Sequence, residues 1–309
     1  MTDQTVQQPP IPAELLRRIR RIEIRARRLV DHLLLGQYHS VFRGRGLEFS
    51  EVREYQPGDD ERIIDWNVSA RMGSLYVKKY VEERELTIYL LVDASASQTF
   101  GTAEQTKAQV AAEIGALLAL AAVRNNDRVG LIIFTDRIER FVPPRKGAQH
   151  VLRLIRDLLY LRAQGRGTDV AGALGFLNRV ARRRSVAFLV SDLLAADFQA
   201  ALRIAARRHD IIAVTLNDRR ELVLPAAGLL QVIDAETGER AWVDSDDPAV
   251  RQAYTAAARR RLDERRRLLA AAGVDEVPIF ADQPYVGPLV SFFRSRLVSG
   301  RARARRVTA

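Results

Sequence analysis

A carboxylate and two hydroxyls stand at alternate positions directly after an apolar stretch of the chain. Residues 87–92 (TIYLLV) have the composition of a strand buried on both faces, and Asp93, Ser95 and Ser97 follow in the pattern D-x-S-x-S. A parallel strand that ends in Asp places its carboxylate at the carboxyl edge of the sheet, where open α/β folds bind ligands. Donors that are all oxygen suit Mg²⁺, Mn²⁺ or Ca²⁺ rather than a soft metal. By itself the pattern is equally typical of an ordinary turn, because Asp and Ser are common in turns.

Two further oxygen-bearing side chains stand at comparable places later in the chain. Asp192 directly follows residues 185–191 (SVAFLVS), another apolar run with the composition of a buried strand. Thr168 lies in a loop that contains Gly165 and Gly167 and leads into a helix. In a doubly wound sheet the two strands that end in Asp become neighbours at the point where the strand order reverses. We therefore expect all five side chains to face one crevice, with the two glycines allowing the Thr168 loop a close approach.

The balance of charge among these five residues indicates binding rather than catalysis. Three are hydroxyls and two are carboxylates, whereas hydrolytic two-metal sites need several carboxylates to hold their ions. No His lies in these loops to act as a general base. An electron-poor ion without a base suits the capture of a carboxylate from another molecule, so we expect an interaction module that is not an enzyme. A metal-dependent hydrolase, a phosphatase or nuclease, stays open as an alternative, although Ser95 stands where a D-x-D phosphatase has its second Asp.

The chain around these residues alternates between apolar strands and amphipathic helices. This alternation predicts an α/β fold with a doubly wound, mainly parallel sheet and right-handed crossovers. Pro143 and Pro144 end one short strand, which is therefore an edge strand. The expected strands are 87–93, 128–134, 138–142, 185–191, 210–216 and 274–280, the expected helices are 104–124, 147–160, 170–182, 198–208, 248–272 and 284–297, and the expected hairpin pairs 229–234 with 240–243.

Composition also divides the chain into segments. The Arg-rich face of the helix expected over 13–35 suits either packing on the domain with a solvated face or contact with a membrane surface. The charges of the helix expected over 248–272 form a solvated face. Residues 1–12 are expected to be disordered, and residues 13–85 to contain the first helix and a β-rich region with strands at 47–49 and 75–77. An α/β domain is expected over 86–298, with a hairpin insertion near 217–247. A basic mobile tail is expected over 299–309.

Charge and residue usage narrow the range of functions further. The 309 residues carry a formal net charge of +11 and include no Cys and four His, which excludes disulfides and argues against a zinc site. A basic chain can bind nucleic acid. However, four of the 49 basic residues are Lys and the other 45 are Arg, a bias that codon usage also produces, and aromatic residues do not interleave with the basic clusters. Nucleic-acid binding through the Arg-rich surface is thus the weaker alternative.

The hydrophobic pattern bears on location. No apolar run reaches the ~18–20 residues of a transmembrane segment. The N-terminal residues have Arg where a signal peptide needs an apolar core. We therefore expect a cytoplasmic protein.

The five oxygen-bearing positions resemble a known metal site. D-x-S-x-S, a distant Thr in a G-T-D context and an Asp after a later strand are similar to the metal-ion-dependent adhesion site of von Willebrand factor A domains. Asp93, Ser95, Ser97, Thr168 and Asp192 match its five positions. The resemblance covers about residues 85–297. It implies a bound divalent ion, Mg²⁺ or else Mn²⁺ or Ca²⁺, that completes its shell with an acidic residue of a partner, while Asp192 acts through water.

The residues before the first strand resemble the signature of the bacterial family called domain of unknown function fifty-eight, whose members carry such a block ahead of an A-type domain. That resemblance implies association with a MoxR-type AAA+ ATPase and a role as adaptor or co-chaperone in assembling or activating a target complex. The matching residues are Gly46-x-Glu48-Phe49, Arg53-x-Tyr55-x-Pro57-Gly58-Asp59-Asp60, Arg62-x-Ile64-Asp65-Trp66 and Ser69-Ala70-Arg71.

The same block makes two structural predictions. Trp66 should be substantially buried, close to the A-type domain, so that its truncation costs roughly 3–5 kcal/mol. The acidic residues should form an ion-pair network that anchors it. The expected network joins Asp59, Asp60 and Asp65 to Arg53, Arg62 and Arg71.

Overall fold

The computed structural model describes residue 20 and residues 48–57, 59–81, 85–101, 105–195 and 197–307. The disorder expected over 1–12 lies outside the described residues, as does, apart from Arg20, the helix expected over 13–35. The main domain is built on a six-stranded sheet with the strand order β10-β7-β6-β3-β4-β5. Its strands are β3 Thr87–Asp93, β4 Arg128–Phe134, β5 Ile138–Arg145, β6 Val186–Ser191, β7 Asp210–Asn217 and β10 Asp275–Phe280.

The sheet is parallel except at one edge. All neighbouring strands run parallel but β4 and β5, which are antiparallel. The expected α/β fold with a mainly parallel sheet is therefore confirmed. β3 lies between β4 and β6, so the strands that precede Asp93 and Asp192 are neighbours, as the sequence predicted. β5 is the expected edge strand, but it continues through Pro143 and Pro144 to Arg145, because an edge position tolerates residues without a backbone N–H.

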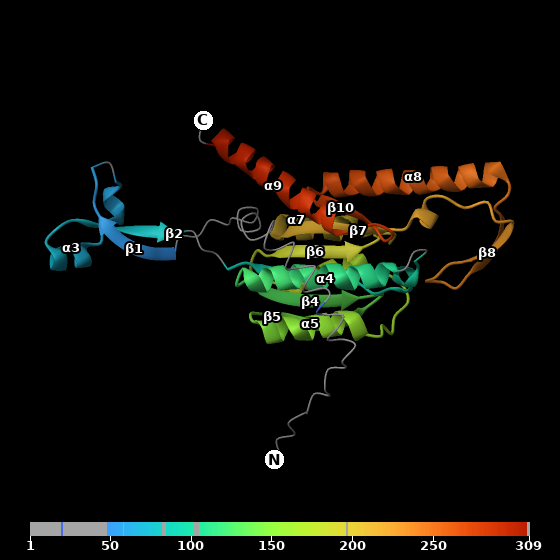
Figure 1. Ribbon diagram of the computed structural model, residues 1–309, viewed down its shortest axis with the longest axis horizontal. Helices are drawn as coiled ribbons and strands as arrows, with labels where there is room; N and C mark the ends of the chain where they lie inside the picture. The colour runs from blue at the N-terminus through green and yellow to red at the C-terminus, as the bar shows by residue number, and fades with distance from the viewer. Residues whose placement is uncertain are drawn as a thin grey trace, which may run out of the picture.

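Helices cover both faces of the sheet (Figure 1). Alternate residues of β3 point to opposite faces, as the pleat of a strand requires: Ile88 and Leu90 pack in one core cluster and Tyr89 and Leu91 in the other. The first cluster includes side chains of α4, α5 and α9, and the second those of α6, α7 and α8. The helices are α4 Lys107–Arg124, α5 Ala148–Tyr160, α6 Val170–Val180, α7 Gln199–Arg208, α8 Pro248–Ala271 and α9 Val286–Val307.

Two expectations about the last third of the chain need correction. The final helix does not end at Leu297, because α9 continues to Val307 through most of the residues for which a mobile tail was expected; the Ala and Arg residues that follow Gly300 are strong helix formers. Arg265 of α8 is 7% exposed and does not belong to a solvated charged face. The expected hairpin is present, with β8 Leu229–Ile233 paired to β9 Arg240–Asp244.

The residues before Leu86 include a small lobe that Figure 1 shows beside the six-stranded sheet. β1 Glu48–Glu54 and β2 Tyr76–Val81 form an antiparallel pair, longer than the two short strands expected there. The 3-10 helix η2 Glu61–Ile63 and the helix α3 Trp66–Met72 connect them, although the sequence analysis expected no helix here. The local signals are a capping Asp65, whose Oδ1 accepts from the backbone of Asn67 and Val68, and Gly73, whose φ of 76° ends the helix.

The burial predicted for Trp66 is wrong. Its side chain is 67% exposed on α3. Among the lobe residues whose burial the structure describes, only Ile64, Ser69 and Val77 are buried, too few to enclose a large ring. The penalty of 3–5 kcal/mol expected for a buried aromatic therefore does not apply to it. Of the expected ion pairs, the structure places Arg53 beside Asp59 at 2.6 Å.

Within the described ranges, no helix combines the length and the apolar character that crossing a bilayer would need.

His209 makes the stability of this fold sensitive to acid. Its ring is buried between α7 and β7, and neither ring nitrogen has a hydrogen-bond partner among the described residues. Burial, with the nearby charges of Arg208 and Arg184, lowers the pKa of His209 from 6.5 to about 4. The neutral ring is thus favoured in the folded state, so its stabilising effect is complete above pH 6.5 and is lost as the pH falls towards 4.

We expect His209→Leu to flatten the decline in stability at acid pH. Between pH 7 and 4.5 the wild-type protein should lose about 2–3 kcal/mol of unfolding free energy more than the variant, because one pKa unit corresponds to about 1.36 kcal/mol. Denaturant unfolding of both proteins at the two pH values measures the difference. Equal losses in the two proteins would show that His209 takes up no proton on unfolding.

Candidate metal centre

Four of the five predicted site residues meet at the carboxyl edge of the sheet. The hydroxyls of Ser95 and Ser97 are 3.1 Å apart, and Ser97 Oγ donates to Oδ2 of Asp192 at 3.0 Å. Asp93 Oδ1 accepts from the backbone N–H of Ser95 at 2.9 Å, which fixes the turn after β3. We call Asp93, Ser95, Ser97 and Asp192 the oxygen cluster. Its geometry follows from the adjacency of β3 and β6, which bring residues almost a hundred positions apart to one edge.

The charge of the oxygen cluster is poorly compensated at Asp93. This carboxylate is 1% exposed, and burial together with the charge of Asp192 raises the pKa of Asp93 from 3.8 to about 6. Hydrogen bonds from Ser191 Oγ at 2.6 Å and from Ser95 act in the opposite direction. A buried carboxylate next to a second carboxylate is an environment that favours a bound cation, which would remove the repulsion.

The loop that carries Thr168 lies against the turn of the oxygen cluster. The backbone N–H of Ala96 donates to the carbonyl of Arg166 at 2.9 Å, and that of Asp169 donates to the carbonyl of Thr135 at 2.8 Å. Gly165 is needed for this approach, because a Cβ built there would lie 2.2 Å from Oγ1 of Thr135. At Gly167 a Cβ would meet nothing closer than 3.7 Å, so the close approach expected of both glycines holds for Gly165.

The hydroxyl of Thr168 itself points to a different partner. It donates to Oε1 of Glu236 at 2.5 Å, across 68 residues of sequence. Glu236 lies in the turn between β8 and β9, within the segment that the sequence predicted as a hairpin insertion. No local pattern in the sequence marks this contact.

Lys107 is a buried cation beside the oxygen cluster that the sequence analysis did not recognise. Its ammonium donates to Oδ2 of Asp192 at 2.8 Å and to Oε1 of Glu221 at 2.6 Å, and its side chain is 0% exposed. Burial opposes the charged form, but the charges of the two carboxylates outweigh it and raise the pKa of Lys107 above its usual range. The one available signal was compositional: a Lys stands at the start of α4 in a chain whose basic residues are almost all Arg.

Arg265 of α8 fixes the backbone that carries Asp192. It donates to the carbonyl of Asp192 at 2.9 Å, to Oδ1 of Asn217 at 2.9 Å and to Oε1 of Glu276 at 3.1 Å. These bonds connect α8 to β7, to β10 and to the loop after β6. Directly after Asp192, Leu193 has a φ of 54°, a left-handed conformation that costs a bulky residue on the order of 1–3 kcal/mol. The site loop is therefore held in one strained geometry by contacts from distant elements.

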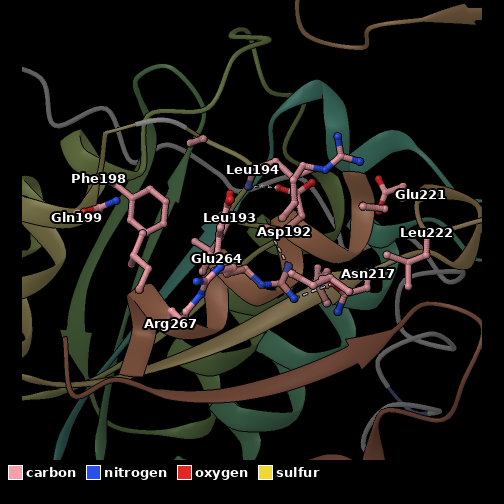
Figure 2. A pocket seen from close by; sticks show the side chains of 17 residues that line it. Asp192, Leu193, Leu194, Phe198, Gln199, Asn217, Glu221, Leu222, Glu264 and Arg267 are labelled. Carbon is pink, nitrogen blue, oxygen red and sulfur yellow. Dashed lines mark hydrogen bonds between the residues drawn. The ribbon is translucent and has the colours of Figure 1, made fainter. Parts of the chain in front are cut away.

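A pocket of about 700 Å³ opens beside Asp192. Figure 2 shows Asp192 and Glu221 at one part of its wall and Phe198 at another. It lies between the loop after β6, the end of β7 and α8, and its apolar lining includes Leu193, Phe198 and Leu268. A ligand that contacts Asp192 could therefore place apolar groups in the adjacent pocket.

The donors of the site fit a hard divalent cation. The oxygen cluster offers carboxylate and hydroxyl oxygens, and Oε1 of Gln98 is buried beside it without a hydrogen-bond partner in the described part of the chain. Among the described residues no three His, Cys, Asp or Glu side chains are grouped to hold an ion, so a metal at this place depends on the hydroxyls. An ion bound there would supply a positive charge to Asp93, while Lys107 already supplies one to Asp192.

The fold and the site define a class: an α/β domain with an oxygen-donor cluster where its central strand ends. The chain belongs to the family described as "Protein of unknown function DUF58", whose model matches residues 51–264. Uncharacterized protein Rv1480 of Mycobacterium tuberculosis (strain ATCC 25618 / H37Rv) is 34% identical over 282 residues, which cover 90% of this chain and 88% of that protein. The membership predicted from residues 46–71 is thereby confirmed.

Two solved structures are similar in fold. The hypothetical protein BatB from Bacteroides thetaiotaomicron matches 69% of this chain and 99% of its own, with 14% identity and a TM-score of 0.44. The SpRpn10 VWA domain matches 67% of this chain and 94% of its own, with 13% identity and a TM-score of 0.36.

Proposed function

We propose that this protein is a metal-dependent protein-interaction module whose bound divalent ion captures an acidic residue of a partner. The observation that carries the proposal is the convergence of Asp93, Ser95, Ser97 and Asp192 at one sheet edge, with hydrogen bonds among them. The proposed ion is Mg²⁺, with Mn²⁺ and Ca²⁺ as the alternatives among cations that prefer oxygen ligands. Thr168 completes the set that resembles an A-type adhesion site, and its loop lies against the Ser95 turn.

The proposed partner is a MoxR-type AAA+ ATPase or the complex that this ATPase remodels, and the proposed setting is the cytoplasm. Support comes from the resemblance of residues 46–71 to a family linked to such ATPases. In this role the protein is an adaptor that presents its metal to an Asp or Glu of the partner. The hollow beside Asp192 offers room for apolar residues that flank the partner's carboxylate. The Arg-rich surface accelerates approach of an acidic face without making the specific contact.

We expect partner binding to depend on the metal more than on salt. Surface plasmon resonance against the ATPase, with salt and EDTA varied independently, should show EDTA abolishing binding. Added salt should only slow association, because the Debye length is ~8 Å at physiological ionic strength. Asp93→Ala and Ser95→Ala should reproduce the effect of EDTA. The paired control, Arg259→Ala with Arg260→Ala on the exposed face of α8, should lower the association rate by about two- to fivefold.

The opposite pattern would refute the proposal. Binding that persists in EDTA and in Asp93→Ala but collapses with salt would assign the contact to the basic surface. Release of phosphate or nucleotide by the metal-loaded protein would instead favour the hydrolase alternative.

A further inference from the structure

The hairpin formed by residues 229–244, which we call the hairpin arm, carries a carboxylate to the metal centre. β8 and β9 pair only with each other, in a two-stranded sheet separate from the six-stranded one. The turn between them is fixed by Asp234, whose Oδ1 accepts from the backbone N–H of Glu236 and of Thr237, both at 2.9 Å. Glu236 thus projects from an ordered tip rather than from a loose loop.

The position of Glu236 is set by a hydrogen bond from Thr168 rather than by an ion pair. In a chain with a net charge of +11, a surface Glu is expected to find an Arg. Within the described residues no basic side chain pairs with Glu236. Its Oε1 accepts instead from Thr168 Oγ1 at 2.5 Å, and its Oε2 would lie 3.9 Å from a Cβ at Gly167.

This contact places a carboxylate on Thr168, one of the five residues proposed to hold the metal. The loop that carries Thr168 lies against the turn of the oxygen cluster, because the backbone N–H of Ala96 donates to the carbonyl of Arg166 at 2.9 Å. A carboxylate that accepts from a hydroxyl ligand lies next to the ion that this hydroxyl would hold, and carboxylate oxygens are ligands that hard divalent cations take. The position that Glu236 takes is therefore one that a metal-bound carboxylate would favour.

The strands of the hairpin arm bury little apolar surface. The side chains of Leu229, Ile233 and Trp242 are 64%, 55% and 65% exposed, and an isolated two-stranded hairpin is marginally stable in water. Its base is held by Ser245, whose Oγ donates to the carbonyl of Gly228 at 2.6 Å and accepts from the N–H of Ala227. With the base anchored and the strands largely solvated, the Glu236–Thr168 hydrogen bond connects the tip to the domain.

We propose that Glu236 is the carboxylate ligand that this chain itself supplies to the metal, so that the hairpin arm covers the site until the acidic residue of a partner displaces it. This inference rests on the proposed metal centre and deepens it. It makes Glu236 a binding residue and the hairpin arm a competitor of the partner. It also explains why an exposed apolar hairpin is positioned over the one edge of the sheet where the oxygen cluster lies.

The test compares Glu236→Gln with Glu239→Gln, a matched change in the same turn, using the full chain and the metal alone as probe. Calorimetry should show that Glu236→Gln weakens Mg²⁺ and Mn²⁺ binding by about 10- to 100-fold, while Glu239→Gln binds as the wild type does. In a Trp66→Phe background, Trp242 on the hairpin arm becomes the only Trp. Its fluorescence anisotropy should rise when Mg²⁺ is added, and this rise should be absent in Glu236→Gln.

The outcomes separate this inference from the proposed function. If the wild type and both Gln variants bind the metal equally and Trp242 does not respond, Glu236 is not a ligand, whereas the metal centre itself stands. If the wild-type protein binds neither metal, both proposals fail together. If Glu236→Gln and Glu239→Gln weaken metal binding equally, the effect comes from the total charge of the turn and not from coordination by Glu236. That result would also overturn the inference.

Discussion

Asp93→Ala is expected to remove Mg²⁺ and Mn²⁺ binding, a loss of affinity above ~100-fold, while the protein stays folded. Loss of residues that merely support metal ligands costs about 10- to 100-fold, and Asp93 is a carboxylate of the cluster itself. The fold should survive because burial and Asp192 already disfavour the charged form of Asp93, so its removal relieves repulsion. Calorimetry measures the affinity, and circular dichroism with denaturant unfolding measures the fold.

A second carboxylate at the same edge of the sheet provides the control for this experiment. Asp136 follows β4, accepts from Arg137 Nε at 2.9 Å and from Thr135 Oγ1 at 3.1 Å, and does not belong to the oxygen cluster. Asp136→Ala should leave the metal affinity within about twofold of the wild type, because its charge is already paired with that of Arg137. Unchanged affinity in Asp93→Ala, or an equal loss in both variants, would disprove the assignment of the site.

The sheet and the oxygen cluster were predictable because their signals are local. β3 and β4 begin and end where their apolar runs do, since a strand buried on both faces needs such a run. Asp93 and Asp192 each follow one of these runs, and the doubly wound order then makes their strands neighbours. Short-range composition and one topological rule were therefore sufficient to predict the centre of the sheet and to bring four of the five candidate residues to one edge.

The remaining errors have a common physical origin in contacts between distant segments. Lys107 meets Asp192 across 85 residues and Glu236 meets Thr168 across 68, and neither contact has a sequence spacing that a motif could record. In the sequence, Arg265 does not differ from the other Arg residues of α8. Its role depends on its contacts with Asn217 of β7 and Glu276 of β10. The error at Trp66 is the exception and has a different origin. A large apolar residue predicts burial, but the described residues around α3 form too small a core to bury it.

The contact between Lys107 and Asp192 leads to the largest expected change in stability. Lys107→Met should lower the free energy of unfolding by about 3–5 kcal/mol, the usual cost of breaking a buried ion pair by removing one partner. Met fills most of the space of the Lys stem, so the loss comes from charge rather than from a cavity. Asp192 is 3% exposed at its side chain and cannot turn to solvent, whereas Glu221 is 26% exposed and can partly rehydrate. Denaturant unfolding in EDTA measures the difference.

Two further variants separate this charge effect from packing. Lys146 pairs with the exposed Glu85, so Lys146→Met should cost less than about 1 kcal/mol. Lys107→Met combined with Asp192→Asn removes both charges and should regain part of the loss, which a pure packing defect would not do. Mg²⁺ should stabilise Lys107→Met more than it stabilises the wild type, because an unpaired Asp192 binds the ion more tightly and binding to the folded state adds to stability. If Lys107→Met is as stable as Lys146→Met, the ammonium does not compensate the charge of Asp192.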